Sequence, residues 1–252
     1  MILRDELASY LHDFLACASF DDYAPNGVQV EGSHSVSRIC TAVTASLDVI
    51  EQAANLQANA LLVHHGYFWR GEAPVIVGMK AKRIARLIHY NISLFAYHLP
   101  LDCHLELGNN ACFALFFDLN NIKTHPIGKT INLLWTATLV KHRTPDVFAA
   151  EIERKLGRKP LHIQGHDKPI QRLAWCSGAA QDFIVEAHAL GADAYLSGEI
   201  SERTYYQAKE LGIHYYACGH HATERQGIQA LGNHLAVKYD LEHYFIDSFN
   251  PV

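Results

Sequence analysis

Apolar residues recur along the chain at two spacings, one typical of helices and one of buried strands. Residues 2–17 carry apolar side chains three and four positions apart, which predicts an amphipathic helix. Short apolar runs bounded by turn residues predict strands, and segments with helical spacing separate them. The predicted strands cover residues 38–43, 60–63 and 93–97, and the predicted helices between them cover residues 47–57 and 79–90. This alternation favours an α/β fold.

The second half of the chain repeats this order of elements. An offset of 134 aligns residues 38–62 with residues 172–196 and gives nine identities in twenty-five positions. Beyond the aromatic loop that follows residue 65, the best offset falls to 122. We therefore predict two pseudo-repeated α/β lobes, residues 1–122 and 123–252, with mixed sheets flanked by helices and strand ends that face a shared cleft.

Composition narrows the class of protein. The chain has 252 residues, of which 49% are hydrophobic, so it can bury a substantial core. Its formal net charge of -5 argues against non-specific nucleic-acid binding, which depends on an excess of Lys and Arg. The net charge does not exclude a local basic patch. No stretch approaches the roughly 20 apolar residues that span a bilayer, and the first six residues are too polar and acidic for a signal peptide. We expect a cytoplasmic protein that does not enter the membrane.

The six cysteines show no CxxC pairing and lie mostly within apolar segments. This pattern indicates reduced, mostly buried thiols and argues against a disulfide framework or a cysteine-type zinc site. The seventeen histidines are the compositional outlier, and they direct attention to imidazole chemistry.

Two adjacent histidines, His64 and His65, close the apolar run at residues 60–63. Buried strands usually end in turn residues, so a specific interaction should hold these rings. Neutral imidazole is the commonest side-chain metal ligand, and ligand sites of open α/β sheets lie at strand ends. The pair alone is equally compatible with a metal ion and with ordinary hydrogen bonds.

A second candidate follows the strand predicted at residues 214–217. If a helix begins near His221, His220 and Glu224 lie about one turn apart and can point to one centre. The alternative is an ordinary helix start, where an acidic residue interacts favourably with the helix dipole.

Together, the candidate ligands follow predicted strands in three separate segments. They are His64, His65, Asp102, His220 and Glu224, with His98 as a sixth candidate. Five nitrogen and oxygen ligands without a thiolate are too many for one tetrahedral structural zinc. They suit two metal ions roughly 3.5–4 Å apart with positions left for water. Such ligands favour Fe or Zn and also permit Mn or Ni.

Six ordered motifs in this sequence resemble those of a known family. The family is that of the bacterial YbgI-like proteins, the GTP cyclohydrolase 1 type 2 homologues, also described as Nif-three-like dinuclear metal proteins. The motifs are Tyr23-Ala24-Pro25-Asn26-Gly27, His64-His65-Gly66, His98-Leu99-Pro100-Leu101-Asp102, Gly108-Asn109-Asn110, Ser197-Gly198-Glu199 and Gly219-His220-His221-Ala222-Thr223-Glu224.

This resemblance covers essentially the whole chain and departs from the family at no ligand position. It implies two α/β lobes around a dinuclear metal site and a toroid of six subunits. It also implies that His64, His65, Asp102, His220 and Glu224 bind two divalent metal ions per subunit. His98 would then orient a ligand or the substrate.

The residues and the resemblance together lead to a metal-dependent hydrolase. Two cations can activate a water molecule and stabilise a developing oxyanion, and the family name implies a purine nucleotide such as GTP as substrate. The alternative is a non-catalytic metal-binding regulatory or scaffold protein that forms a ring around nucleic acid or a protein partner. A phosphodiesterase would use the same two-metal chemistry.

Several neighbouring residues have two interpretations each. Glu199 can act as general base or hydrogen-bond to a histidine, or it can simply precede the helix that starts near Ser201. Tyr67 and Trp69 can stack on a base or pack against other parts of the protein, and packing is favoured for Phe68. Four basic side chains could attract a phosphate-bearing substrate, although the last three suit a solvated helix face; they are Arg70, Lys80, Lys82 and Arg83.

Overall fold

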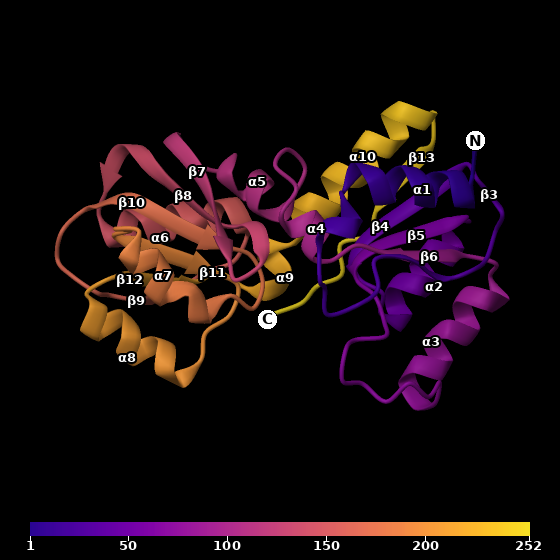
Figure 1. Ribbon diagram of the computed structural model, residues 1–252, viewed down its shortest axis with the longest axis horizontal. Helices are drawn as coiled ribbons and strands as arrows, with labels where there is room; N and C mark the ends of the chain where they lie inside the picture. The colour runs from indigo at the N-terminus through magenta and orange to yellow at the C-terminus, as the bar shows by residue number, and fades with distance from the viewer. The chain divides into compact units, whose positions relative to one another are not determined.

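The computed structural model describes residues 1–252, which form two compact units (Figure 1). The first unit contains Met1–Gly108 and Arg225–Phe249, and the second contains Asn109–Glu224 and Asn250–Val252. Division of the chain at residue 122 would assign Arg225–Phe249 to the second lobe. This segment instead belongs to the first unit, because its strand pairs with the sheet there.

The first unit is built on a five-stranded sheet in the order β13-β4-β5-β6-β2. Its strands are β2 (Gly27–Val30), β4 (Arg38–Thr44), β5 (Ala60–His65), β6 (Ser93–Ala96) and β13 (Glu242–Phe245). Strands β13, β4, β5 and β6 run parallel, and β2 is antiparallel to β6. A separate pair joins β1 (Ile2–Leu3) to β3 (Ser35–Val36).

Helices cover both faces of this sheet (Figure 1). They are α1 (Arg4–Phe14), α2 (Leu47–Asn55), α3 (Gly78–His89), α4 (Leu99–Asp102) and α10 (Arg225–Tyr239), and a short 3-10 helix, η1 (Cys17–Ser19), follows α1. Because side chains alternate along a strand, β4 contributes to two cores. Ile39 and Val43 pack with α1 and α10, whereas Cys40 and Ala42 pack with α2 and α3.

The second unit has a six-stranded mixed sheet in the order β7-β8-β10-β11-β12-β9. Its strands are β7 (Leu119–Ile127), β8 (Thr130–Arg143), β9 (Leu161–Ile163), β10 (Ile170–Cys176), β11 (Ala194–Ser197) and β12 (His214–Ala217). The three central strands β10, β11 and β12 are parallel. Strand β8 runs antiparallel to β10 and to β7, and β9 runs antiparallel to β12.

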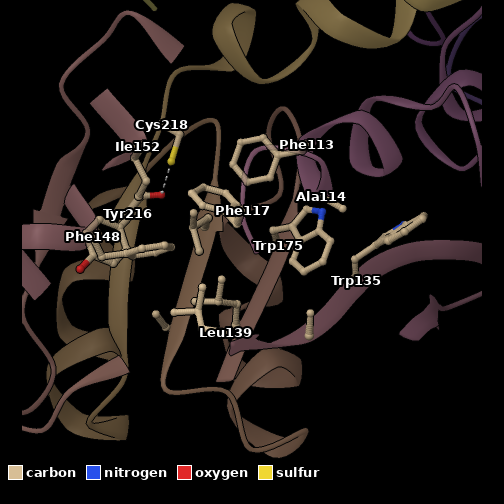
Figure 2. Packing of buried hydrophobic residues seen from close by; sticks show 14 of the residues in the cluster. Phe113, Ala114, Phe117, Trp135, Leu139, Phe148, Ile152, Trp175, Tyr216 and Cys218 are labelled. Carbon is tan, nitrogen blue, oxygen red and sulfur yellow. Dashed lines mark hydrogen bonds between the residues drawn. The ribbon is translucent and has the colours of Figure 1, made fainter. Parts of the chain in front are cut away.

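The core of the second unit is rich in aromatic side chains. Figure 2 shows Phe113 and Phe117 beside Trp175, with Phe148 against Tyr216. The helices of this unit are α5 (Asn109–Ala114), α6 (Pro145–Leu156), α7 (Ile184–Ala189), α8 (Glu202–Leu211), α9 (His220–Thr223) and the 3-10 helix η2 (Gln181–Phe183). Phe148 on α6 is fully buried, so its truncation to alanine would cost about 3–5 kcal/mol.

The internal repeat is visible in the strand register. Ile39 pairs with Ala60 in the first unit, and Leu173 pairs with Ala194 in the second, so the offset of 134 holds across both strands. In the next strand the register places Ser93 at the position of His214, one residue out of step with the offset of 122 that aligns His98 with His220.

The predicted α/β class, with mixed sheets flanked by helices, is confirmed. All six cysteines are buried and free, as their pattern indicates. Neither the hairpin of β7 and β8 nor strand β13 is among the elements expected from the sequence. None of the helices is both long enough and apolar enough to cross a membrane.

Candidate metal centre

In the first unit, three histidines gather at the carboxyl ends of two neighbouring strands. His64 and His65 are the last residues of β5, and His98 follows β6. One ring nitrogen of each lies within 4.8 Å of the other two, and His64 is completely buried. The rings of His64 and His65 are 4.6 Å apart between centroids. The strand-end placement expected for these side chains is therefore observed.

A backbone contact fixes the orientation of His64. Its Nδ1 lies 2.9 Å from the carbonyl oxygen of Tyr97, which can only accept a hydrogen bond. Nδ1 therefore carries the proton in the neutral ring, and the Nε2 lone pair points away from Tyr97. Nδ1 of His65 lies 3.2 Å from Thr44 Oγ1, so this ring is also contacted through Nδ1.

Asp102 lies close to the Nε2 side of the His64 ring. It is the last residue of α4 and is 5% exposed, and its Oδ2 is 3.5 Å from His64 Nε2. The short helix places it there, because the backbone amide of Asp102 donates to the carbonyl oxygen of His98 at 3.1 Å. The motif His98-x-x-x-Asp102 thus forms one compact turn beside the histidine pair.

His98 is held by a carboxylate that the sequence argument missed. Its Nδ1 lies 2.7 Å from Asp22 Oδ1, and the amide of Leu99 donates to Asp22 Oδ2 at 2.8 Å. Burial alone would raise the pKa of Asp22, but its hydrogen bond with His98 and the charge of that ring lower it overall. Asn26 Oδ1 also accepts from the His98 amide. Asp22 lies just before the Tyr23–Gly27 motif, so that turn has a positioning role.

In the second unit, one histidine lies between two carboxylates. His220 Nδ1 is 2.6 Å from Glu199 Oε1, and His220 Nε2 is 3.1 Å from Glu224 Oε2. Glu224 is 2% exposed. Burial lowers the pKa of His220, but the hydrogen bonds and negative charges of Glu224 and Glu199 outweigh this effect and raise it to about 9. This pairing agrees with the predicted one-turn spacing of His220 and Glu224.

Two glycines provide the space for this triad. A side chain at Gly178 would collide with Glu224 Oε1, and Gly178 has a φ of +65°. A Cβ at Gly198 would lie 2.6 Å from the Gly178 carbonyl oxygen and 2.7 Å from His220 Cα. Gly198 belongs to a motif recognised in the sequence, whereas Gly178 gave no signal beyond its place after strand β10.

The donor set fits divalent metal ions with nitrogen and oxygen ligation. Metal-binding histidines almost always use their other ring nitrogen to contact a carbonyl or carboxylate, which fixes the tautomer. His64 and His220 both have this arrangement through Nδ1, and each has a buried carboxylate close to Nε2. With no thiolate nearby, such sites suit transition metals that accept imidazole and carboxylate.

The aromatic side chains of the loop after His65 lie in two places, the core of the first unit and the neighbourhood of His98. Tyr67 is 4% exposed and donates its hydroxyl proton to the Ala45 carbonyl oxygen at 2.8 Å, so it packs in the core. Phe68 packs against the same core, as favoured from the sequence. Trp69 instead lies edge-on to His98, with ring centroids 5.0 Å apart.

Two of the four basic side chains near this loop are neutralised locally. Arg70 pairs with Asp21 at 2.5 Å, and Lys80 pairs with Glu72 at 2.7 Å. These ion pairs favour a structural role for both residues over attraction of a substrate phosphate.

The whole chain is similar to proteins of one family. The model of the Duf34/NIF3 (NGG1p interacting factor 3) family matches residues 2–251. A protein of Allochromatium vinosum named GTP cyclohydrolase 1 type 2 homolog is 47% identical over 246 residues, which cover 98% of this chain and 96% of that protein.

Solved structures extend this similarity to the fold. Protein ybgI, described as of unknown function, superposes with a TM-score of 0.94 at 44% identity, and TTHA1606 from Thermus thermophilus with a TM-score of 0.90 at 30% identity. Each comparison covers 100% of both chains. The match over nearly every residue and the shared fold show that this chain belongs to the Duf34/NIF3 family.

Proposed function

We propose that this chain is a dinuclear metal-dependent hydrolase that acts on a purine nucleotide or a related small molecule. The proposed ligands are His64, His65 and Asp102 from the first unit and His220 and Glu224 from the second. In this proposal these side chains bind two divalent metal ions, Fe or Zn, with Mn or Ni as further candidates.

The observation that carries the proposal is a histidine–carboxylate pair in each unit. His64 Nε2 lies 3.5 Å from Asp102 Oδ2, and His220 Nε2 lies 3.1 Å from Glu224 Oε2. His64 lies at the carboxyl end of β5, and the other three residues belong to the segments that follow β6 and β12, at the strand ends where ligand sites of α/β sheets occur. Each unit thus has one histidine–carboxylate pair, and this similarity supports a two-metal centre built from an internal repeat.

Neighbouring acceptors would then fix which ring nitrogen of His64 and of His220 carries the proton. The Tyr97 carbonyl keeps the His64 proton on Nδ1, and Glu199 keeps the His220 proton on Nδ1. Two divalent cations, when bound, lower the pKa of a water molecule and stabilise negative charge on the reacting oxygen. His98, held by Asp22, and Trp69 beside it would orient the substrate.

The substrate class is supported by the name shared among the relatives, GTP cyclohydrolase 1 type 2 homolog. Hydrolytic opening of a purine ring at the imidazole carbon adds water and needs no redox cofactor. We also propose that the protein assembles as a toroidal homohexamer, in which six such centres are present.

Metal analysis combined with a turnover assay tests the proposal. We expect close to two equivalents of metal in the parent protein, and a clear loss in His65→Ala and Glu224→Gln. Glu210→Gln, which alters an exposed carboxylate on α8, is the matched control and should keep the full metal content.

Turnover is measured with GTP through the loss of purine absorbance and through chromatography of the product. Activity should require metal and should fall together with metal content in both ligand variants. An unchanged metal content in these variants would overturn the proposed centre. A metal-loaded protein that converts neither GTP nor other purine nucleotides would overturn the hydrolase and favour a metal-binding scaffold.

A further inference from the structure

The internal repeat places an arginine at the same position in both units. The offset of 134 aligns Arg38 with Arg172, and Asn59 with Asp193. Asn59 Oδ1 accepts from the backbone amide of Arg38 at 3.0 Å, and Asp193 Oδ2 accepts from that of Arg172 at 2.8 Å. Both strands therefore begin in the same way, so the surroundings of the two guanidinium groups can be compared directly.

The two arginines differ in what neutralises their charge. Arg38 Nη2 lies 2.7 Å from Glu242 Oε2, because β13 pairs with β4 and places Glu242 opposite Arg38. In the second unit the corresponding neighbour is β8, which places Thr138 opposite Arg172. The carboxylate that balances the first arginine is thus replaced by a hydroxyl beside the second.

Arg172 lines a cavity of about 410 Å³ over strands β7, β8 and β10. Its lining contains a histidine, an amide, four apolar residues and no carboxylate. The lining also contains two cationic side chains and two hydroxyls, those of Lys123, Arg172, Thr136 and Thr138. The volume is within the range of roughly 300–1,000 Å³ typical of small-molecule sites.

The strand register aims the polar side chains into this cavity from one face of the sheet. Lys123 is paired with Thr136, and Arg172 with Thr138. Residues paired across neighbouring strands share a face, and so do two residues two positions apart on one strand. The two cations therefore flank two hydroxyls, from strands roughly 10 Å apart, a span that long side chains can close around one anion.

A glycine makes room for the arginine side chain. A Cβ on Gly191 would lie 3.0 Å from Arg172 Nη1 and 3.4 Å from its Cζ. The residue at this position in the first unit is Gln57, whose Oε1 accepts from Arg38 Nη1 at 3.3 Å. The second unit therefore lacks both the carboxylate and the amide that occupy the first arginine.

The cavity is separate from the candidate metal ligands of its own unit. Arg172 lies near the beginning of β10, and Ala192 lies just before β11. Glu199 and His220 follow the opposite ends of β11 and β12, which run parallel to β10. Anything bound between Lys123 and Arg172 is thus at the other end of the sheet.

We propose that this cavity binds a phosphate monoester of a small molecule. The phosphate group accepts from Arg172 and Lys123, whose charges balance it, and from the hydroxyls of Thr136 and Thr138. The body of the ester lies against the exposed apolar side chain of Leu190. A neighbouring cavity of about 470 Å³ shares Arg172 and is lined by both the cationic side chain of Lys168 and the carboxylate of Asp193.

Calorimetric titration with phenyl phosphate tests this proposal, because that probe joins a phosphate to an apolar ring. We expect saturable binding to the parent protein and about tenfold weaker binding to Arg172→Gln and to Lys123→Gln. Lys129→Gln, in the turn between β7 and β8 but outside the cavity, is the matched control and should bind like the parent. Benzyl alcohol, which lacks the charge, should not bind.

Two further arms identify the site and the ligand class. Glu224→Gln should retain binding of phenyl phosphate. If Glu224→Gln lost this binding while Arg172→Gln kept it in full, the phosphate would bind at the metal centre and the proposal would be overturned. Absence of binding to the parent at millimolar concentration would also overturn it. So would tight binding of a single-stranded oligonucleotide together with no binding of phenyl phosphate.

Discussion

Nδ1 of His220 lies 2.6 Å from Glu199 Oε1, and this contact turns the opposite nitrogen of the ring toward Glu224. Glu199 was considered both as a general base and as a hydrogen-bond partner of a histidine. The hydrogen bond to His220 needs only an acceptor oxygen on residue 199, whereas a general base needs an ionised carboxylate.

Replacement of Glu199 separates these two functions. Glu199→Gln keeps an acceptor for the Nδ1 proton, so its metal affinity should stay near that of the parent. Glu199→Ala removes the acceptor and should weaken metal binding by about 10–100-fold. Metal affinity is measured by competition with a chelator, and Glu202→Ala, an exposed carboxylate on α8, is the control. Loss of turnover in Glu199→Gln at full metal content would assign the base to Glu199.

Asp22 should matter far more for stability than its neighbour Asp21. The Asp22 side chain is 3% exposed and accepts from His98 and Leu99, whereas that of Asp21 is 82% exposed. Asp22→Asn replaces one acceptor oxygen with a donor and should cost about 1–3 kcal/mol of unfolding free energy. Urea unfolding measures this difference. Equal stability of Asp22→Asn and Asp21→Asn would show that the His98 contact contributes nothing.

Gly178 and Gly212 offer a matched test of the space around Glu224. Both have a φ of +65°, so alanine costs about 1–2 kcal/mol of backbone strain at either position. Nothing lies within 4 Å of a Cβ at Gly212, whereas one at Gly178 meets Glu224 Oε1. Gly178→Ala should therefore lose metal as well as stability, and Gly212→Ala should lose stability alone. Metal content and thermal unfolding of both variants provide the comparison.

The second unit should lose stability in mild acid because of His214. Burial, followed by the charges of His166 and His162, lowers the pKa of His214 from 6.5 to about 4. Above pH 6.5 the ring is neutral in both states. As the pH falls toward 4 the unfolded chain takes up a proton first, so up to about 3 kcal/mol of unfolding free energy is lost.

Denaturant unfolding at several pH values, followed by tryptophan fluorescence, measures this loss. Trp135 and Trp175 lie in the same unit as His214, so their emission reports on the relevant core. His214→Gln should flatten the dependence between pH 6.5 and 4, and the slope that remains reports on His162 and His125, whose pKa values burial also lowers. His188→Gln, at an exposed histidine, should leave the slope unchanged. A slope unaffected by His214→Gln would contradict the assignment.

Local pattern was sufficient to place His64 and His65 at a strand end and to bring His220 close to Glu224. The apolar run before His64 has no polar interruption, and the one-turn spacing of His220 and Glu224 needs only a helix start to become a contact. The offset of 134 is also preserved in the strand register, because the paired residues of the two strands have the same separation in sequence in both units.

No local sequence pattern predicted the interactions between segments that are distant in the chain. Strand β13 pairs with β4 across some two hundred residues, and nothing in its four residues indicates that partner. The sequence presents Asp22 only as part of a turn, because its contact with His98 depends on how β6 ends. The β8 strand did carry a signal: Trp135, Ala137 and Leu139 alternate with threonines, the period of a strand with one buried face.

The return of α10 and β13 to the first unit also bears on the order of folding during synthesis. Residues 109–224 form most of the second unit from one uninterrupted stretch, so its sheet can close while the C-terminal segment is still in the ribosome. Until residue 245 emerges, β4 has an unpaired edge, which is a surface prone to pairing with another chain. A nascent chain stalled before that point would therefore have a finished second unit and an aggregation-prone first one.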